Sequence, residues 1–400
     1  MPHLPVLSQP LSALVEPLAR DGFFGDELLS AVRRQLKSFL EMSLDLELTA
    51  YLGCSRHQRT EGRQGYRNGY YTRDLETGFG LLEQIQVPRC RRAGFQPTLF
   101  QRYQRRRQEV ERFVQALFFA GVSTRAVGEV LEVLLGFAPS AAAVSQIVAR
   151  IDAQVQAFHR RILSDDYVYL FLDGLTVTLK ELPEAKKRLV LVAYGLTARG
   201  QRVLLDYRVA PSESSTEWER FLQSLYDRGL RGENLRLITT DGGSGLQAAL
   251  PLVYGETPHQ LCWVHKLRNV ATHVKRSDEV ACLDQAQEIY RATTRQAARE
   301  AWQRWATEWS ARYPAAVRCL GRDLERLLTF LTVQSIPPEH YRSVRTTNYV
   351  ERVMRELRRR IRPMGSFAHK TSCDRLFYGV VERLNRNWSR KTLPAFTQNS

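Results

Sequence analysis

Cysteine is scarce in this chain of 400 residues: the six cysteines are scattered and form no dense framework. That usage is typical of a reduced, intracellular protein and argues against a small domain held together by disulfides. No apolar run approaches the roughly 18 residues that cross a membrane. The N-terminus also lacks the basic start and the unbroken apolar stretch of a signal peptide. We therefore expect a soluble, cytoplasmic protein with no membrane partner.

Acidic residues are in deficit: 42 Asp and Glu stand against 58 Lys and Arg, which gives a formal net charge of +16. The hydrophobic content of 44% is ordinary for a globular protein, so the charge does not indicate general disorder. A positive surplus of this size indicates nucleic acid or another anionic surface as partner. A basic protein without such a partner is the alternative. The length suggests about two to four domains.

Three segments of different composition precede residue 161. We expect residues 1–52 to form an N-terminal helical region, because apolar residues return at steps of three and four. Residues 53–105 are rich in Gly, Tyr and Arg, which predicts a basic region of short strands and turns. Arginines interleaved with tyrosines can neutralise phosphates and stack on bases, so DNA contact is favoured over a solvated basic face.

Residues 106–160 are expected to form three helices, the second capped at Ser123 and the third running as one stripe from Ser140 to Phe158. Three short helices suit a helix-turn-helix-like DNA-binding domain, although many small helical bundles share the pattern. The DNA-contact residues that we assign before residue 161 are Arg67, Arg73, Arg105 and Arg106.

From residue 161 the apolar pattern changes to that of strands. Residues 161–254 predict three antiparallel strands, a crossover helix and a fourth strand, with an Asp ending the first and fourth strands. This order is that of the ribonuclease-H-like fold. Residues 255–340 show no strand and are expected to form an all-helical insertion domain, after which residues 341–400 resume the core and end in a basic tail. The fold class is therefore α/β: a ribonuclease-H-like catalytic core interrupted by a helical insertion and preceded by mainly helical DNA-binding domains.

Three carboxylates carry the expected chemistry. Asp173 and Asp241 each end an apolar run of strand length, and Glu351 lies on a strongly basic helix. Cutting or joining a phosphodiester needs an activated oxygen nucleophile and a leaving oxygen relieved of charge, which two divalent ions about 3.5–4 Å apart provide. Mg²⁺ prefers hard oxygen ligands. We expect Asp173 to bridge two Mg²⁺ ions, with Mn²⁺ as a substitute, and the other two residues to hold one ion each.

Each carboxylate also has a structural alternative. An Asp before Gly at a strand end is commonly a turn former, and Glu351 can pair with Arg355 one turn later. Glu356 is a competing third carboxylate, but it lies about 140° further round the helix than Glu351. The basic residues of this helix are expected to lie away from Glu351, free to meet phosphates. The DNA-contact residues that we assign in this part of the chain are Arg268, Arg352, Arg355 and Arg359, with Arg362 beside them.

At these residues the chain resembles the Mutator-type transposases of bacterial insertion sequences, which belong to the larger group with a DDE catalytic triad. The matching stretches run in the family's order from about residue 45 to 390 and include LGCSRHQRTEGRQGYRNGYYTRDLET, LDG, TTDGGSGL, CWVHKLRN and TNYVERVMRELRRR. By position, Asp173, Asp241 and Glu351 match the triad. Cys262 and His265 match the family's C-x2-H motif. Two small departures, Leu261 and Met354, lie outside the triad.

The resemblance implies a DNA transposase that binds the terminal inverted repeats of its own element, cleaves a strand with metal ions and transfers it, through a circular intermediate. It also implies double-stranded DNA as the partner, a homodimer or higher assembly on paired ends, and association with the nucleoid. Two alternatives stay open: a catalytically silent DNA-binding regulator derived from a transposase, which the intact triad disfavours, and a ribonuclease-H-like nuclease, which the long insertion and N-terminal region disfavour.

Zinc is a weaker interpretation of the cysteines. Cys262 and His265 are two ligands where a structural site needs four, so we expect this pair to brace the site or to position DNA. His273 and Cys282 are the residues that could complete a zinc site with this pair. Cys54, His57 and Cys90 form a second loose cluster, which also lacks a fourth ligand. The helical spacing of Trp302, Trp305 and Trp309 favours ordinary core over base stacking.

Overall fold

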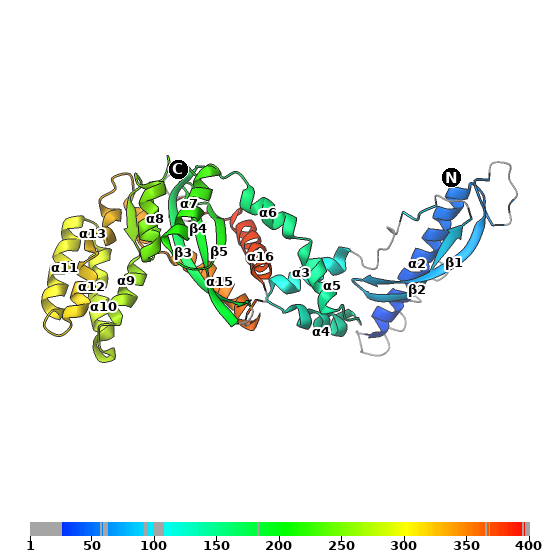
Figure 1. Cartoon of the computed structure of the whole chain (residues 1–400), viewed down its shortest axis with the longest axis horizontal. Coiled ribbons are helices and arrows are strands. Elements are labelled where there is room, and N and C mark those ends of the chain that lie inside the picture. The colour runs from blue at the N-terminus through cyan, green and yellow to red at the C-terminus, as the bar shows by residue number, and fades with distance from the viewer. Residues whose placement is uncertain are drawn as a thin grey trace. The chain divides into compact units, whose positions relative to one another are not determined.

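A computed structural model describes residues 26–56, 58, 63–91, 95–98, 108–135, 137–181, 184–364, 366–367, 369–393 and 396. The chain divides into two compact units, residues 1–149 and 150–400 (Figure 1), and each is described by itself. Helices and strands are mixed, as the α/β expectation requires. None of the helices in these ranges is long and apolar enough to span a membrane.

In the first unit a long helix packs on a two-stranded antiparallel sheet. The elements are α2 (Asp26–Leu52), β1 (Arg67–Thr77) and β2 (Gly80–Cys90). Leu40 and Leu44 of α2 are buried against Leu82 and Ile85 of β2, at 2% exposure or less. The turn between the strands includes Gly80 at φ +113, a backbone angle that favours glycine. The strands and turns predicted for residues 53–105 thus form a hairpin that is held by the apolar face of α2.

Three short helices complete the first unit: α3 (Gln108–Phe119), α4 (Thr124–Leu135) and α5 (Ala141–Ala149). Both predicted caps are present, because the hydroxyls of Ser123 and Ser140 each accept a backbone N–H three residues later at 3.2 Å. The third helix is shorter than predicted. It ends at Ala149, and a separate helix, α6 (Asp152–Arg160), begins the second unit. The apolar stripe continues through Ile151, which is why periodicity alone predicts one helix.

Helix α6 is fastened to the rest of the second unit by charged contacts. Both oxygens of Asp152 accept hydrogen bonds from Arg375, at 2.5 and 2.6 Å. His159 lies between two carboxylates, 2.7 Å from Asp206 and 3.3 Å from Asp374. Burial alone would lower the pKa of His159, but these two acids outweigh it and raise the pKa to about 9. The imidazole is therefore charged at neutral pH and holds three elements together.

A five-stranded mixed sheet forms the centre of the second unit. Its strands are β3 (Tyr167–Glu181), β4 (Glu184–Thr197), β5 (Arg202–Ala210), β6 (Leu237–Thr240) and β7 (His259–Leu261). The spatial order is β5-β4-β3-β6-β7, with β3, β4 and β5 antiparallel and β6 and β7 parallel to β3. The predicted three-strand meander, crossover helix and fourth strand are confirmed. The prediction of no strand within residues 255–340 is wrong, because β7 occupies three of them.

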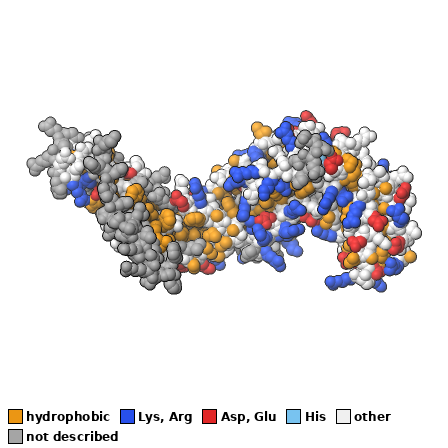
Figure 2. Space-filling model, turned by 180° about the vertical axis from the view of Figure 1, so that it is seen from behind, with side chains coloured by type: hydrophobic (Ala, Val, Ile, Leu, Met, Phe, Trp, Pro, Cys, Tyr) orange, Lys and Arg blue, Asp and Glu red, His pale blue; other side chains and the backbone are white. Residues whose placement is uncertain are grey.

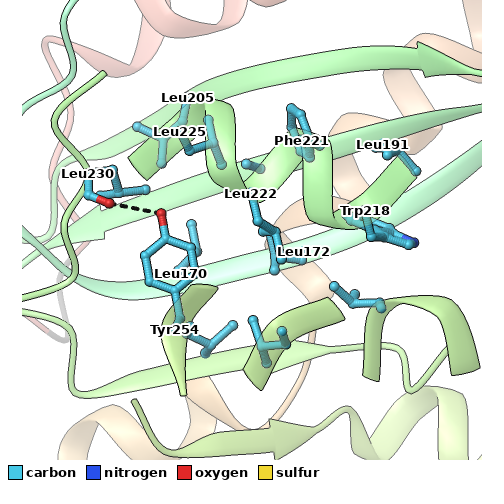
Figure 3. Close-up of a cluster of buried hydrophobic side chains, with 14 of the residues drawn as sticks. Leu170, Leu172, Leu191, Leu205, Trp218, Phe221, Leu222, Leu225, Leu230 and Tyr254 are labelled. Atoms are coloured by element: carbon cyan, nitrogen blue, oxygen red, sulfur yellow. Dashed lines mark hydrogen bonds between the residues drawn. The ribbon is translucent and has the colours of Figure 1, made fainter. Parts of the chain in front are cut away.

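One face of this sheet is covered by α7 (Ser215–Asp227) and α8 (Ser244–Tyr254). Leu170 and Leu172 of β3 point to this side and meet Trp218 and Leu222 of α7, all fully buried (Figure 3). Burial of each such side chain contributes roughly 1.5–3 kcal/mol. The hydroxyl of Tyr254 ends the cluster by donating to the Leu230 carbonyl at 2.8 Å (Figure 3).

The other face of the sheet meets α15 (Asn348–Met364) and α16 (Lys370–Trp388). Phe171 of β3 and Tyr194 of β4 both contact the ring of Tyr349 on α15, with centroids 5.8 and 6.0 Å apart. Because side chains alternate between the faces of a strand, Asp173 lies on the same face as Phe171. The strand thus presents Asp173 toward the side of the sheet that carries α15.

All elements between β7 and α15 are helical. They are α9 (Trp263–Ala271), α10 (Arg276–Arg291), α11 (Arg295–Trp309), α12 (Pro314–Gly321), α13 (Leu324–Leu327), η2 (Thr329–Leu331), η3 (Pro338–His340) and α14 (Tyr341–Val344). Trp305 and Trp309 are each 2% exposed in the core of this helical region, and Trp302 packs against that core while partly buried. The prediction that these tryptophans are core residues is confirmed for Trp305 and Trp309.

Candidate functional site

Strand pairing brings Asp173 and Asp241 together. The last parallel pair of β3 and β6 is Leu172 with Thr240, so Asp173 is the next residue of β3 and Asp241 is the residue that follows β6. Asp241 directly follows β6, as predicted. The prediction that a strand ends at Asp173 is wrong, because β3 continues to Glu181 and Asp173 pairs with Val192. The apolar run stops at this point but the backbone pairing does not.

Asp173 is a buried carboxylate, 5% exposed. One of its oxygens accepts the backbone N–H of Gly174 at 2.8 Å. Burial raises the pKa of Asp173, and the negative charges of Asp241 and Glu351 raise it further, to about 7. The turn-former alternative fails for this residue, since it lies within a strand. Asp241 and Glu351 are the two acids whose charges contribute to this shift.

The turn after β6 holds Asp241 in a fixed position. Gly242 has φ +90, and the Gly243 N–H donates to Asp241 Oδ1 at 3.0 Å. Asp241 is therefore both a turn former and a member of the acidic cluster, which we define as Asp173, Asp241 and Glu351. The side chain of Gln247, on α8, donates to the Gly242 carbonyl and fastens the turn from behind.

A second layer of hydrogen bonds supports that turn. Arg326 of α13 donates to Gln247 Oε1 at 2.5 Å and to His259 Nδ1 at 3.0 Å. Because Nδ1 accepts, the proton of a neutral His259 is on Nε2, which lies 2.8 Å from the Thr240 hydroxyl. Burial, followed by the charge of Arg326, lowers the pKa of His259 to about 4 and keeps it neutral. Sequence patterns gave no indication of these residues, since they meet only in the folded chain.

Glu351 lies in the first turn of α15, and its ion-pair partner is Arg268 of α9 rather than Arg355. Arg268 Nη1 is 2.9 Å from Glu351 Oε1, but this contact lacks hydrogen-bond geometry. Among the described residues, this buried oxygen therefore accepts no hydrogen bond. The competing acid Glu356 points elsewhere and pairs with Arg359 at 2.9 Å and Arg360 at 2.5 Å.

Cys262 and His265 contact Thr347, the residue immediately before α15. The backbone N–H and the hydroxyl of Thr347 both donate to Cys262 Sγ at 3.3 Å, and that hydroxyl lies 3.4 Å from His265 Nδ1. The carbonyl of Thr347 in turn accepts the Glu351 N–H at 2.9 Å. Burial lowers the pKa of His265, while the charges of Asp241 and Glu351 oppose this. The pair therefore lies beside the acidic cluster.

A fourth carboxylate, Glu213, was missed by the sequence analysis. A Cβ added at Gly243 would lie 2.5 Å from Glu213 Oε1 and 3.5 Å from Asp241 Oδ1, so the two oxygens are at most 6.0 Å apart (2.5 plus 3.5). Partial burial, followed by the charge of Asp241, raises the pKa of Glu213. Glu213 comes from the loop between β5 and α7, where its sequence context shows only polar residues.

The donor set fits a hard divalent cation. Glu351 Oε1 is a buried oxygen without a hydrogen-bond donor, and Asp173 carries a charge that burial and repulsion both disfavour. Within the described ranges no group of three or more His, Cys, Asp or Glu side chains is placed to hold one ion. A two-ion arrangement needs only pairs of carboxylates for each ion, with water and phosphate completing the shell. The same finding means that neither zinc interpretation has a set of ligands among the described residues. His57, which belongs to the second of them, lies outside those residues.

Exposed arginines of α15 adjoin the acidic cluster. Arg355, Arg358, Arg359 and Arg362 line one groove on this helix, and Figure 2 shows Lys and Arg side chains gathered over the middle of the second unit. The expectation that Arg355 and Arg362 lie away from Glu351 is wrong. At about 100° per residue they return to within about 40° of its direction. Arg352 is exposed at about 100° to one side. Arg358 was not assigned from the sequence.

Two of the four arginines assigned in the first unit, Arg67 and Arg73, lie among the described residues. Arg67 lies 3.3 Å from Asp45 and donates to the Thr49 hydroxyl at 2.6 Å, and its side chain is 18% exposed. Arg73 lies on β1 and is half-buried. Arg105 and Arg106 lie outside the described residues. The geometry of this unit therefore gives Arg67 a structural role in holding the hairpin to α2.

Comparison with known proteins identifies the family. Residues 18–391 match the sequence profile described as "Transposase, Mutator family". The chain belongs to the Mutator family of transposases, which confirms the resemblance inferred from its motifs. Membership supports a role as a transposase, an enzyme that acts on DNA.

Several insertion-sequence proteins are similar to this chain along most of their length. The transposase for insertion sequence element ISRM5 of Rhizobium meliloti (strain 1021) is 34% identical, over 91% of this chain and 90% of the relative. The transposase for IS905 of Lactococcus lactis subsp. lactis (strain IL1403) is 31% identical, over 92% of each chain. The transposase for IS256 in transposon Tn4001 of Staphylococcus aureus is 30% identical, over 96% of each.

Proposed function

We propose that the chain binds the terminal inverted repeats of its insertion sequence, cleaves a DNA strand at each end and transfers it. The observation that carries this proposal is the acidic cluster: the pairing of β3 with β6 brings Asp173 and Asp241 together, and the pKa of Asp173 is raised to about 7 by burial and then by the charges of Asp241 and Glu351. The strand order β5-β4-β3-β6-β7 supports a ribonuclease-H-like core, and the helices between β7 and α15 support a helical insertion within it.

The acids divide the work of holding cations. Asp173, the most deeply buried of the three, would hold the ions together with Asp241 and Glu351. Two Mg²⁺ ions, or Mn²⁺ in their place, would supply an activated oxygen nucleophile and charge relief at the leaving oxygen. Water first breaks a phosphodiester and leaves a free 3′-hydroxyl. That hydroxyl then attacks a second phosphodiester, forming one P–O bond as another breaks.

The C-x2-H motif positions the third acid. Cys262 and His265 hold Thr347 through its backbone and hydroxyl, and Thr347 begins the helix turn that carries Glu351. Fixing the start of α15 fixes the direction of Glu351 toward Asp173. This role needs no zinc, and it agrees with the buried position of the Cys262 side chain, 1% exposed.

The DNA-contact residues follow the charge of the surface. Arg268, Arg352, Arg355 and Arg359 lie exposed in the second unit, and we assign them to phosphates near the reacting bond. The helices and hairpin of residues 53–160 are the proposed end-recognition region, with Arg73, Arg105 and Arg106 as contacts. Assembly as a dimer or higher on paired ends, and association with the nucleoid, complete the proposal.

The test is cleavage of a labelled duplex that carries the element's end, with Mg²⁺ or Mn²⁺. Asp173→Asn, Asp241→Asn and Glu351→Gln should each abolish nicking at the repeat boundary while end binding persists. Glu356→Gln is the matched control, because it removes an acid from the same helix that faces away from the cluster, and it should cleave normally. Binding without cleavage by the wild type under all metal conditions would favour the catalytically silent regulator instead.

A further inference from the structure

Helix geometry aligns three arginines with Glu351. Arg355, Arg358 and Arg362 follow Glu351 by four, seven and eleven residues on α15. At about 100° per residue they lie within about 40° of its direction, and at 1.5 Å per residue they lie about 6, 10 and 16 Å further along the axis. We call these three residues the arginine stripe. It starts one turn after the third acid and runs straight away from it.

The stripe carries positive charge that the protein leaves uncompensated. Within the described ranges none of its three members forms an ion pair, whereas the neighbouring Arg359 pairs with Glu356 at 2.9 Å. All three are exposed and line one groove together with Arg359. Like charges at these helical spacings repel one another. An anion in the groove would remove that repulsion.

The near end of the groove reaches the acidic cluster. Burial and the neighbouring carboxylates raise the pKa of Asp173, and Arg358 is the cation that opposes them. Burial lowers the pKa of His265, and Arg358 adds to that effect after Arg268. Helix geometry places Arg355 about one turn and Arg358 about two turns along the axis from Glu351, so the near end of the groove adjoins the cluster.

We propose that the arginine stripe binds successive phosphates of the single DNA strand that enters the acidic cluster. This inference rests on the proposed function and names the strand path for the same site. Along one strand of a duplex a phosphate recurs about every 3.4 Å of axis, so the roughly 10 Å between the first and last arginines spans about three phosphates. Guanidinium forks match phosphate oxygens in pairs, which favours arginine over lysine at each step.

The experiment combines neutral phosphates with arginine variants. Full-length Asp173→Asn protein, which should bind without cutting, is titrated with labelled end duplexes that each carry one uncharged methylphosphonate near the repeat boundary. Arg358→Ala should weaken binding about tenfold, the value of one charged hydrogen bond, and should reduce the salt slope of log K by about 0.9. At one position along the strand, the neutral methylphosphonate should lower the affinity of the parent protein for the duplex but leave the affinity of the Arg358→Ala variant unchanged. Arg355→Ala and Arg362→Ala should shift that insensitive position stepwise along the same strand.

Two controls separate contact from misfolding. Arg358→Lys should recover part of the affinity and of the salt slope, which a merely structural loss would not. Arg304→Ala removes an exposed arginine of α11 that pairs with Glu288 at 4.0 Å, and it should leave affinity and slope unchanged. The proposal is overturned if each stripe variant keeps the parental slope, or if no phosphate loses its effect in Arg358→Ala. Since this is a binding assay, a stripe result stands even where wild-type protein fails to cleave, and that failure would count against the proposed function alone.

Discussion

Asp173→Asn should make the metal-free protein more stable at pH 8, although it should destroy activity. Burial and two neighbouring acids raise the pKa of Asp173 from its ordinary 3.8 to about 7. Between these two pH values the folded state keeps a proton on Asp173 that the unfolded state releases. The contribution of Asp173 to the free energy of unfolding is therefore fully present below pH 3.8 and is lost as pH rises through 7. At about 1.4 kcal/mol for each pKa unit the full loss is about 4 kcal/mol, of which about 2.5 falls between pH 5 and 8.

Chemical unfolding in EDTA at pH 5 and pH 8 measures this effect. The difference in unfolding free energy, Asp173→Asn minus wild type, should rise by about 2.5 kcal/mol between the two pH values. Groups that do not interact with Asp173 titrate alike in both proteins and cancel. Glu219→Gln, at an exposed position of α7, should show no such rise. Added Mn²⁺ should stabilise the wild type at pH 8 and have much less effect on the variant. A difference that is unchanged or falls would refute the conclusion that the folded protein raises the pKa of Asp173.

Three further results are expected. Thr347→Val should lower cleavage about two- to tenfold, because it removes a neutral hydrogen bond that helps to position Glu351, with end binding unchanged and activity kept in Thr347→Ser; equal loss in both would contradict the positioning role. Trp305→Ala should destabilise the protein by about 3–5 kcal/mol, because it empties a fully buried site, and calorimetry that shows no loss would revive the base-stacking interpretation. His159, with its pKa raised to about 9, contributes stability that is complete below pH 6.5 and lost as pH rises through 9; thermal unfolding of His159→Gln should lack that loss.

Much of the second unit could be predicted because local chemistry and long-range structure agree there. The runs around Asp173 and Asp241 are apolar and bounded by turns, so they predict strands. The cap at Ser140 depends on a residue within one turn of its helix and is equally local. The resemblance to the family assigns Glu351 to the cluster. Glu356 is rejected because it lies on another face of the same helix, and in the structure Glu356 pairs with arginines.

The wrong and missing predictions share a physical cause. Each concerns a feature that depends on a contact between distant parts of the chain, which the spacing of residues in the sequence does not reveal. The strand through Asp173 continues because its backbone pairs with β4, and pairing tolerates the polar side chains that end the apolar run. The strand β7 has three residues, too few to show a period. Glu213 and Arg326 reach the Asp241 turn from a loop and from a helix far along the chain. Only the folded chain brings such groups to one place.

The charges of the site favour binding its two ligands together. A cation at the acidic cluster is attracted by Asp173 but repelled by Arg358, and a phosphate in the groove meets the same two charges with opposite effect. Once one ligand is present, it cancels the charge that opposes the other. The affinity for DNA should therefore rise with Mg²⁺, and the affinity for Mg²⁺ should rise with DNA by the same factor, as linkage requires. Under the proposed function the metals should therefore bind weakly until a strand arrives, and the complete site should form only on DNA.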